Sequence, residues 1–189
     1  MIERIMVSGS GGDGAVFLGK TLSWAGMAGT AGRRYYTAGL PSYGPEIRGG
    51  TSRCAVTVSD APIGSPVFTS FESLIVFNDL SLERFEPGVA PGGLIVLNAD
   101  VVTRAPARAD LTVLPVRCST EAAALESPRS MNVIALGVWA AHKAHVLDRA
   151  ALLAGLRHVT RSDRAMELNT RALDRGLALA RALAPVGAR

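Results

Sequence analysis

Short apolar runs, separated by breaks rich in glycine and proline, fill the first part of the chain. Residues 5–7 form an apolar run that leads directly into a glycine-rich turn, and residues 15–28 then have the small and apolar side chains of a helix. Residues 74–77 and 94–97 are continuous apolar runs, as expected for strands in a sheet that helices cover on both faces. The pattern therefore predicts a strand, loop and helix unit followed by central strands.

Composition and alternation indicate further strands and one short helix. Residues 33–37 contain the aromatic and β-branched side chains that strands prefer. Residues 53–59 are apolar at every second position, which predicts a strand with two different faces. Residues 111–114 are a further strand candidate, and residues 81–85 can form a short helix between the two central runs.

The last third of the chain has helical periodicity. Ile134 shares a helix face with Gly137, and Met166 shares one with Leu173. Because the elements come in this order, we predict an α/β fold, namely a three-layer Rossmann-like domain with a mostly parallel sheet and a helical C-terminal region. No repeat or linker divides the sequence, so residues 1–189 are expected to form a single domain.

Composition narrows the class of protein. A chain of 189 residues with 48% hydrophobic content is long enough for one buried core. The formal net charge of +4 is small and scattered along the sequence, which argues against a nucleic-acid binder but leaves anionic small ligands open. The N-terminal residues lack the apolar stretch of a signal peptide, and no apolar window approaches membrane-spanning length, so we expect a cytoplasmic protein without membrane contact.

Metal-binding and catalytic side chains are scarce. Cys54 and Cys118 lie far apart with no CxxC, so the chain has neither a cysteine zinc site nor the thiolates to hold an iron–sulfur cluster alone. His142, His145 and His158 have no matching carboxylate motif, and we predict no metal site. Because cysteines are so few, any redox centre is expected to come from elsewhere. No catalytic acid, base or nucleophile constellation is evident either.

A glycine-rich segment, residues 9–14, follows the first apolar run, and we name it the glycine loop. Its spacing fits G-x-G-x-x-G between a strand and a helix, as in turns whose backbone N–H groups hold a phosphate. Arg33 and Arg34 lie where an acidic residue would favour NAD, so a phosphorylated nucleotide is favoured instead. The alternative is that the glycines only allow tight packing while the aspartate caps the helix. The predicted cofactor-binding residues are Gly9, Ser10, Gly11, Gly12, Asp13, Gly14, Arg33 and Arg34.

A second segment, Ser42–Thr51, combines a carboxylate, a guanidinium, a tyrosine and three glycines just before a strand. A loop that only joins two elements needs turn residues for its backbone angles and has no use for this chemistry. The segment therefore predicts a surface that meets a ligand or a partner. Its interface or positioning residues are Ser42, Tyr43, Gly44, Pro45, Glu46, Arg48, Gly49 and Gly50.

The two segments, together with residues 58–66, resemble the gamma subunit of 2-oxoacid:ferredoxin oxidoreductases, the family of the pyruvate and 2-oxoglutarate enzymes. The resemblance continues in residues 131–137 and, more weakly, in residues 167–169 with Ala172 and Gly176. This resemblance covers most of the chain. It implies a subunit, inactive alone, of an enzyme that converts a 2-oxoacid and coenzyme A to acyl-CoA and carbon dioxide and passes electrons to ferredoxin or another acceptor.

The resemblance also implies cofactors and partners. The gamma domain is associated with coenzyme A, whereas thiamine diphosphate with Mg lies between alpha and beta subunits and iron–sulfur clusters belong to beta or delta subunits. The implied partners are alpha and beta subunits, alone or with a delta ferredoxin-like subunit. Within such an assembly Glu46 and Arg48 could pair with each other, contact a neighbouring subunit or orient the coenzyme A arm.

One residue departs from the family pattern. Separate gamma subunits commonly carry Gln where this chain has Asp13, and a carboxylate beside a phosphate cradle repels the anion unless it points away.

Two other functions stay open at this point. The chain could be a stand-alone NADP-binding oxidoreductase, for which Arg33 and Arg34 are the evidence, or a scaffold subunit with an empty nucleotide pocket.

Overall fold

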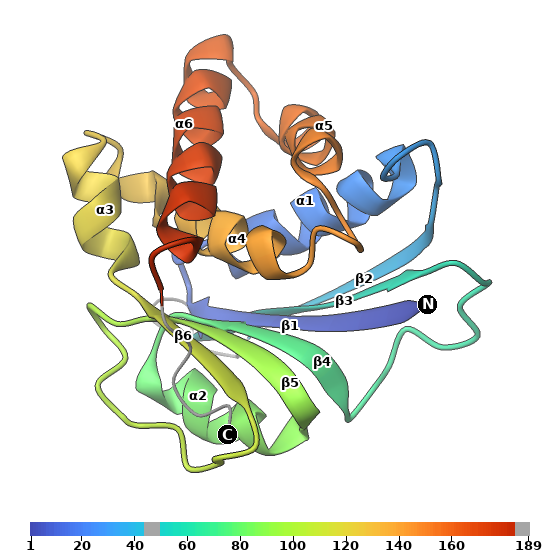
Figure 1. The fold of residues 1–189 in the computed structure, drawn as a ribbon, viewed down its shortest axis with the longest axis horizontal. Coiled ribbons are helices and arrows are strands. Elements are labelled where there is room, and N and C mark those ends of the chain that lie inside the picture. Colours follow the sequence, from blue (N-terminus) through green and yellow to red (C-terminus); the bar gives the residue numbers. More distant parts are fainter. Residues whose placement is uncertain (44–49, 184–189) are drawn as a thin grey trace.

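The protein is an α/β domain built on one six-stranded sheet (Figure 1). A computed structural model describes residues 1–43 and 50–183. The strands are β1 (Ile2–Ser10), β2 (Tyr36–Tyr43), β3 (Thr51–Ser59), β4 (Phe71–Val76), β5 (Val89–Asn98) and β6 (Thr112–Val116). The helices are α1 (Ala15–Ala28), α2 (Asp79–Phe85), α3 (Cys118–Ala124), α4 (Met131–His142), α5 (Arg149–Val159) and α6 (Asp163–Ala180), with 3-10 turns η1 (Glu86–Gly88) and η2 (Pro128–Ser130).

The sheet is mixed, in the order β2-β3-β1-β4-β5-β6. β1, β4, β5 and β6 pair in parallel, whereas β3 pairs antiparallel with both β1 and β2. The prediction of a mostly parallel sheet is therefore corrected: the sheet is mixed, and parallel pairing is confined to the four adjacent strands β1, β4, β5 and β6. Because β3 runs back between β1 and β2, the strand that follows α1 is separated from β1 and becomes an edge strand.

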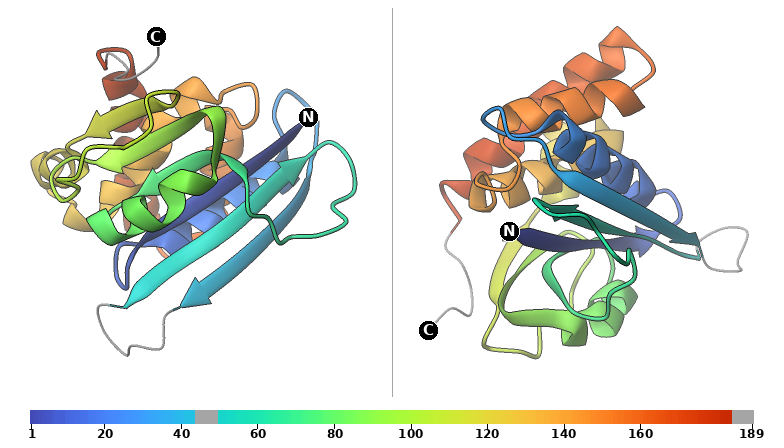
Figure 2. Two further views of the ribbon diagram at one scale, coloured as in Figure 1. Left: turned by 90° about the horizontal axis from the view of Figure 1, so that it is seen from below. Right: turned by 90° about the vertical axis from the view of Figure 1, so that its right-hand side faces the viewer.

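Helices are divided unequally between the two faces of the sheet. α1 and α4 lie against one face, with α5 packed on α1 and α6 packed on α4, while the short α2 lies on the opposite face (Figures 1 and 2). Two buried clusters correspond to these faces. One contains Leu18, Val56 and Trp139 on the α1 side, and the other contains Met6, Leu74 and Leu82 on the α2 side.

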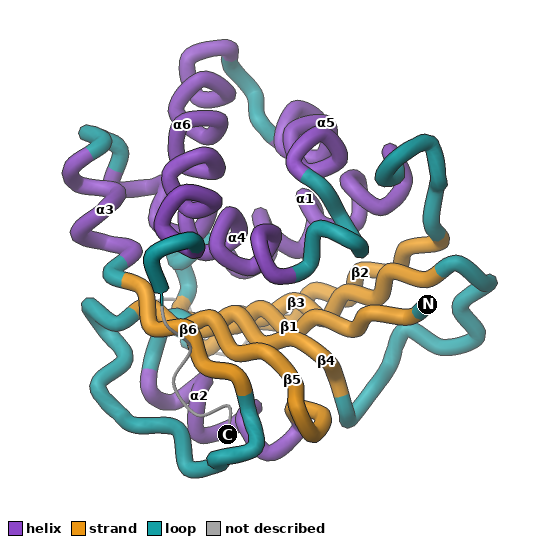
Figure 3. The backbone as a smooth tube through the Cα atoms, viewed as in Figure 1, coloured by secondary structure: helices purple, strands orange, loops and turns teal. Residues whose placement is uncertain are grey.

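Most predicted elements are confirmed, and their bounds differ where local signals are weak. The helix predicted at 15–28 is α1, with the same bounds, and the central apolar runs lie within β4 and β5. The second strand begins later than predicted and reaches Tyr43, through Gly39 and Pro41. Pro41 is tolerated because β2 is an edge strand, where a missing N–H costs no ladder hydrogen bond. The tube in Figure 3 shows that helices dominate the chain after β6.

A buried ion pair joins α4 to the start of β1. The carboxylate of Glu3 lies 3.0 Å from Nζ of Lys143, the residue that follows α4, and accepts a hydrogen bond from Oγ of Ser73 on β4. Glu3 is only 4% exposed, so an unpaired carboxylate here would be costly. The pair holds the C-terminal end of α4 beside the edge of the sheet where β1 begins.

Helices α4 and α6 pack at backbone distance through two glycines. A Cβ on Gly137 would lie 2.3 Å from the carbonyl oxygen of Leu173 and 2.9 Å from Cα of Gly176. Backbone atoms cannot move aside as a side chain can, so a methyl group here would separate the helices.

None of the helices in the described part of the chain is long and apolar enough to cross a membrane.

We predict that Gly137→Ala lowers the free energy of unfolding by about 1–3 kcal/mol because α6 must move away from α4. Gly64→Ala is the matched control: no atom lies within 4 Å of its added Cβ, and the change should be within about 0.5 kcal/mol. Urea unfolding of the three proteins measures both values. Equal stability of Gly137→Ala and the wild type would contradict the close packing.

Candidate functional site: the glycine loop at the carboxyl ends of the parallel strands

The carboxyl ends of the parallel strands meet at one edge of the sheet, and two chain connections diverge there. From β1 the chain passes to α1 on one face, and from the adjacent β4 it passes to α2 on the opposite face (Figure 1). In open α/β sheets such a divergence leaves a crevice outside the strand ends, where ligands bind. The glycine loop lies at this divergence, and we call the region beside it, outside the ends of β1 and β4, the crevice.

The four glycines of the loop have two different roles. A Cβ on Gly9 would lie 2.6 Å from Oδ2 of Asp13, and one on Gly14 would lie 1.9 Å from Nδ2 of Asn132. These two positions serve tight packing, as the alternative interpretation of the sequence proposed. Gly11 and Gly12 are exposed, and no atom lies within 4 Å of a Cβ placed on Gly12. The middle of the loop is therefore open to a ligand.

The N-terminus of α1 has no side-chain cap. Gly14 adopts a left-handed conformation with φ of 85°, and the first helical hydrogen bond runs from the N–H of Leu18 to the carbonyl of Gly14, at 2.9 Å. The amides of residues 15–17 thus have no acceptor within the helix. Uncapped amides and the positive end of the helix dipole together suit an anion.

Asp13 turns back into the loop and does not cap α1. Its Oδ2 accepts a hydrogen bond of 2.6 Å from the N–H of Ser10, and its own N–H donates to the carbonyl of Ser10 at 3.1 Å. Partial burial raises the pKa of the Asp13 carboxyl above its ordinary value of 3.8, and the Ser10 N–H partly offsets this increase. The interpretation of Asp13 as the helix cap is therefore wrong, because the carboxylate braces the loop from inside.

Polar side chains connect the two walls of the crevice. Nδ2 of Asn78 donates a hydrogen bond of 2.8 Å to Oγ of Ser10, while Oδ1 of the same side chain accepts from the N–H of Ser81 and caps α2. Below them the hydroxyl groups of Ser8 and Ser81, both buried, lie 2.9 Å apart. The glycine loop and the start of α2 are thus held together by hydrogen bonds.

Asn132 is a site residue that the sequence did not single out. It is 5% exposed at the start of α4, and its amide lies directly against Gly14. A cavity of about 590 Å³ opens beside it, lined by Phe17, Ser130, Leu168 and Asn169 among others. The only signal was that residues 131–137 and 167–169 share in the family resemblance, although no chemistry marked them separately.

The segment Ser42–Thr51 reaches the same edge as the glycine loop. Ser42 and Tyr43 end β2, and the carbonyl of Gly50 accepts a hydrogen bond of 2.9 Å from the N–H of Gly11. Tyr43 is 69% exposed. The other predicted residues of this segment lie outside the described residues: Gly44, Pro45, Glu46, Arg48 and Gly49.

Arg33 and Arg34 lie at the opposite edge of the sheet, where β1 begins, whereas the glycine loop lies where β1 ends. They precede β2, whose Tyr36 pairs with Ser59, next to the start of β1. Arg33 forms a salt bridge with Asp60 there, at 3.4 Å. The nine residues of β1 separate this edge from the glycine loop by about 26 Å. The structure therefore does not bring the predicted arginines and glycines into one site.

Metal ligands and reactive thiols do not gather in the described residues. Across 1–43 and 50–183, no three His, Cys, Asp or Glu side chains are grouped so that they could hold a metal ion. Burial raises the pKa of Cys54 to about 11 and raises the pKa of Cys118 further, so both thiols are protonated at neutral pH. What the described site can do chemically is bind and orient an anion.

Comparisons with known proteins found matches over most of this chain. The family model of pyruvate ferredoxin/flavodoxin oxidoreductases matches residues 4–179. The ketoisovalerate oxidoreductase subunit VorA of Methanothermobacter thermautotrophicus is 32% identical over 179 residues, which cover 94% of this chain. The same match covers 36% of VorA, so the chain spans about a third of that relative.

Solved structures share the fold. The gamma subunit of a keto/oxoacid ferredoxin oxidoreductase from Geobacter sulfurreducens superposes with a TM-score of 0.82 at 24% identity, covering 96% of this chain and 98% of that one. The 2-oxoglutarate:ferredoxin oxidoreductase from Magnetococcus marinus, solved with 2-oxoglutarate, coenzyme A and succinyl-CoA bound, also gives 0.82, at 23% identity. There the match covers 97% of this chain and 32% of the other.

The raised pKa of Asp13 predicts a pH-dependent difference in stability between the wild type and Asp13→Asn. Because the folded protein holds this proton more tightly than the unfolded chain, the wild type loses stability as pH rises from about 3.8 through the folded pKa. The variant lacks this titration, so the free energy of unfolding of the wild type minus that of the variant should fall across that interval and stay constant above it. Urea unfolding at a series of pH values measures the difference, and an increase with pH would contradict the burial of the carboxyl group.

Proposed function

Because this chain belongs to the pyruvate ferredoxin/flavodoxin oxidoreductase family, we propose that it is the gamma component of a 2-oxoacid:ferredoxin oxidoreductase and that it binds coenzyme A. In this role the chain holds the carrier and directs its thiol toward an acyl group produced on partner chains. The substrate oxidised and the electron acceptor are then properties of the whole assembly.

One observation carries the proposal: an uncapped helix N-terminus with two exposed glycines lies at the crevice where α1 and α2 diverge. Coenzyme A has a pyrophosphate, which suits such a set of backbone amides. The 2-oxoglutarate enzyme from Magnetococcus marinus was solved with coenzyme A bound, which supports this choice of ligand.

The residues of the chain suit binding better than bond breaking. Gly9 and Gly14 hold α1 close to its neighbours, so the amides that follow keep a fixed direction. Asp13 braces the loop through Ser10, and Asn78 ties the loop to α2. When bound, coenzyme A supplies a thiol nucleophile. The contribution of this chain to the rate is proximity, because a held thiol reacts as if at a high local concentration.

Decarboxylation and electron transfer are assigned to the partners. The sequence contains only two cysteines, and both are buried in the hydrophobic core. They cannot provide the four thiolates of an iron–sulfur cluster. We therefore propose that alpha and beta subunits or domains, with a delta ferredoxin-like subunit where one exists, carry thiamine diphosphate, Mg and the clusters. The two-thirds of VorA outside the match is one place for such a partner domain.

A stand-alone NADP enzyme is the weaker alternative. It depended on Arg33 and Arg34 lying beside the glycine loop, whereas they lie at the far edge of the sheet. A scaffold with an unused nucleotide pocket is distinguished from our proposal by direct binding measurements.

We predict that the chain binds coenzyme A in preference to NADPH and, without partner subunits, does not oxidise any 2-oxoacid. Isothermal titration calorimetry with each nucleotide tests the first part. Reduction of a ferredoxin or viologen dye by the purified chain, supplied with 2-oxoacids and coenzyme A, tests the second. Tighter binding of NADPH, or oxidation by the isolated chain, would overturn the assignment, and absence of any nucleotide binding in the assembled complex would favour the scaffold.

Charge placed in the glycine loop should oppose binding. Gly11 is exposed, does not have a positive φ, and its nearest neighbour to a new Cβ is the carbonyl oxygen of Gly50 at 3.7 Å, so substitution is compatible with the fold. We predict that Gly11→Asp weakens coenzyme A binding about tenfold or more compared with Gly11→Asn, which has the same size without the charge. Calorimetry at low ionic strength measures the ratio, and equal affinities of the two variants would place the phosphates elsewhere.

A further inference from the structure

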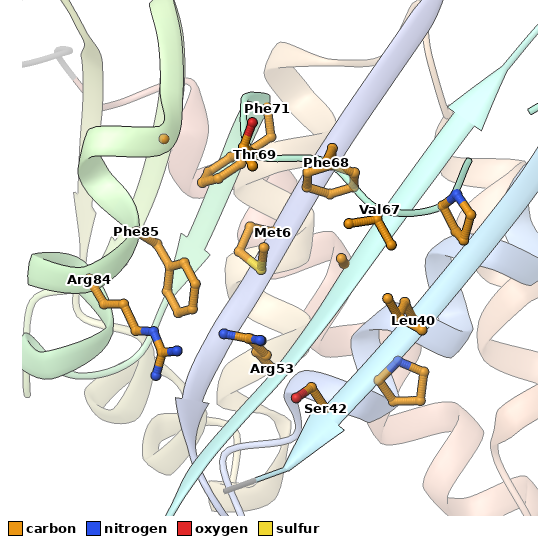
Figure 4. Close-up of a pocket in the computed structure, with 14 residues that line it drawn as sticks. Met6, Leu40, Ser42, Arg53, Val67, Phe68, Thr69, Phe71, Arg84 and Phe85 are labelled. Atoms are coloured by element: carbon orange, nitrogen blue, oxygen red, sulfur yellow. The ribbon is translucent and has the colours of Figure 1, made fainter. Parts of the chain in front are cut away.

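A groove on the α2 face of the sheet is not used by the function proposed above. Its volume is about 500 Å³, within the range typical of small-molecule sites. β1, β2 and β3 form its floor, residues 66–69 close one side and α2 closes the other (Figure 4). Most of the lining is apolar, and Met6, Leu40, Val67 and Phe68 are among its members.

Two arginines from different elements converge at one end of this groove. Cζ of Arg53, on β3, and Cζ of Arg84, on α2, each lie 5.5 Å from the centre of the Phe85 ring. The two guanidinium carbons are therefore at most 11 Å apart. Figure 4 shows both side chains directed toward each other beside Phe85, with the hydroxyl of Ser42 nearby.

These arginines lack the ion pairs that several other arginines form. Among the described residues, eight arginines form salt bridges with Asp or Glu, but no described carboxylate lies within 4 Å of Arg53 or Arg84. Two like charges held beside one ring repel each other, and a shared anion would relieve that repulsion. Planar guanidinium groups also bind phosphate through paired hydrogen bonds and stack on aromatic rings. The end of the groove is thus suited to a phosphate attached to a flat or apolar body.

Each arginine lies a few residues from a residue that is hydrogen-bonded to the glycine loop. Arg53 is paired with Ser8 in the sheet, and it follows Gly50, which bonds to the loop, by three residues, or about 10 Å of strand. Arg84 is six residues beyond Asn78, which bonds to Ser10, and six residues of helix span about 9 Å. One extended ligand can therefore lie in the crevice and reach both groups.

We propose that Arg53 and Arg84 bind the ribose 3′-phosphate of the coenzyme A whose pyrophosphate lies on the glycine loop. This inference rests on the proposed function and extends it. The 3′-phosphate carries close to two negative charges, which two guanidinium groups neutralise, and the apolar lining of the groove beside Phe85 receives the attached nucleoside. Phosphate binding, which the sequence suggested for Arg33 and Arg34, is thus assigned to Arg53 and Arg84, which only the fold brings together.

Dephospho-coenzyme A, which lacks only the 3′-phosphate, is the probe that isolates this contact. Equilibrium binding of coenzyme A and of dephospho-coenzyme A is measured on the protein assembled with its partner subunits. The variants are Arg53→Gln, Arg84→Gln, their combination and the charge-conserving Arg53→Lys. Arg161→Gln, at an exposed arginine between α5 and α6, is the matched control. Thermal melting and size-exclusion chromatography of every variant show whether folding and assembly are intact.

We expect the wild type and Arg161→Gln to bind coenzyme A at least about tenfold more tightly than the dephospho form. Each Gln variant should lose about threefold for coenzyme A alone, Arg53→Lys should lose less, and the double variant should bind both ligands equally because the two losses multiply to the whole preference. The dephospho form should bind all proteins with similar affinity, because the missing phosphate is the group that the arginines contact.

Several results would overturn the inference, and each differs from failure of the proposed function. If the wild type binds both ligands equally, or if the variants weaken both to the same extent, the arginines do not bind the 3′-phosphate although the carrier still binds. If the variants keep the tenfold preference but assemble poorly with the partners, the groove is a protein interface instead. Absence of binding of either ligand by the wild-type complex would overturn the proposed function itself.

Discussion

The close approach of α1 to its neighbours is the constraint on which the rest of the structure depends. A Cβ on Gly19 would lie 2.2 Å from Sγ of Cys54 on β3, and one on Gly26 would lie 2.3 Å from Cγ2 of Thr37 on β2. On the other side of the helix, a Cβ on Gly155 of α5 would lie 2.3 Å from the carbonyl oxygen of Thr21. With contact at this distance on both sides, α1 has almost no freedom to slide, so the turn that begins it is held at the edge of the sheet.

In the glycine loop that begins α1, the glycines have two different roles. Gly9 and Gly14 allow packing, whereas Gly11 and Gly12 leave the surface of the loop exposed before the uncapped amides of α1. The carboxylate of Asp13 is used inside the loop, where it bonds to Ser10 and does not occupy the helix N-terminus. A loop with an internal acid can therefore still present positive partial charge to a phosphate.

The divergence of α1 and α2 then decides where a ligand can lie. The two helices leave neighbouring strands in opposite directions, and Asn78 bridges the gap by a hydrogen bond to Ser10. A ligand on the glycine loop thus has access to the α2 face, where Arg53 and Arg84 are located. The same fold at 24% identity in the Geobacter protein indicates that the sheet geometry tolerates extensive change of side chains.

Local sequence alone determined the strand, glycine loop and helix at the start of the chain, with α1 in the predicted bounds, because short-range periodicity and turn chemistry are sufficient there. It did not determine the order of the strands. The insertion of antiparallel β3 between β1 and β2 depends on pairing between distant residues, which no local pattern records. That insertion moves Arg33 and Arg34 away from the glycine loop and brings Arg53 within reach of it. Asn132 likewise reached the glycine loop, and Arg84 the groove on the α2 face, only through tertiary packing, since their positions depend on where α4 and α2 meet the sheet.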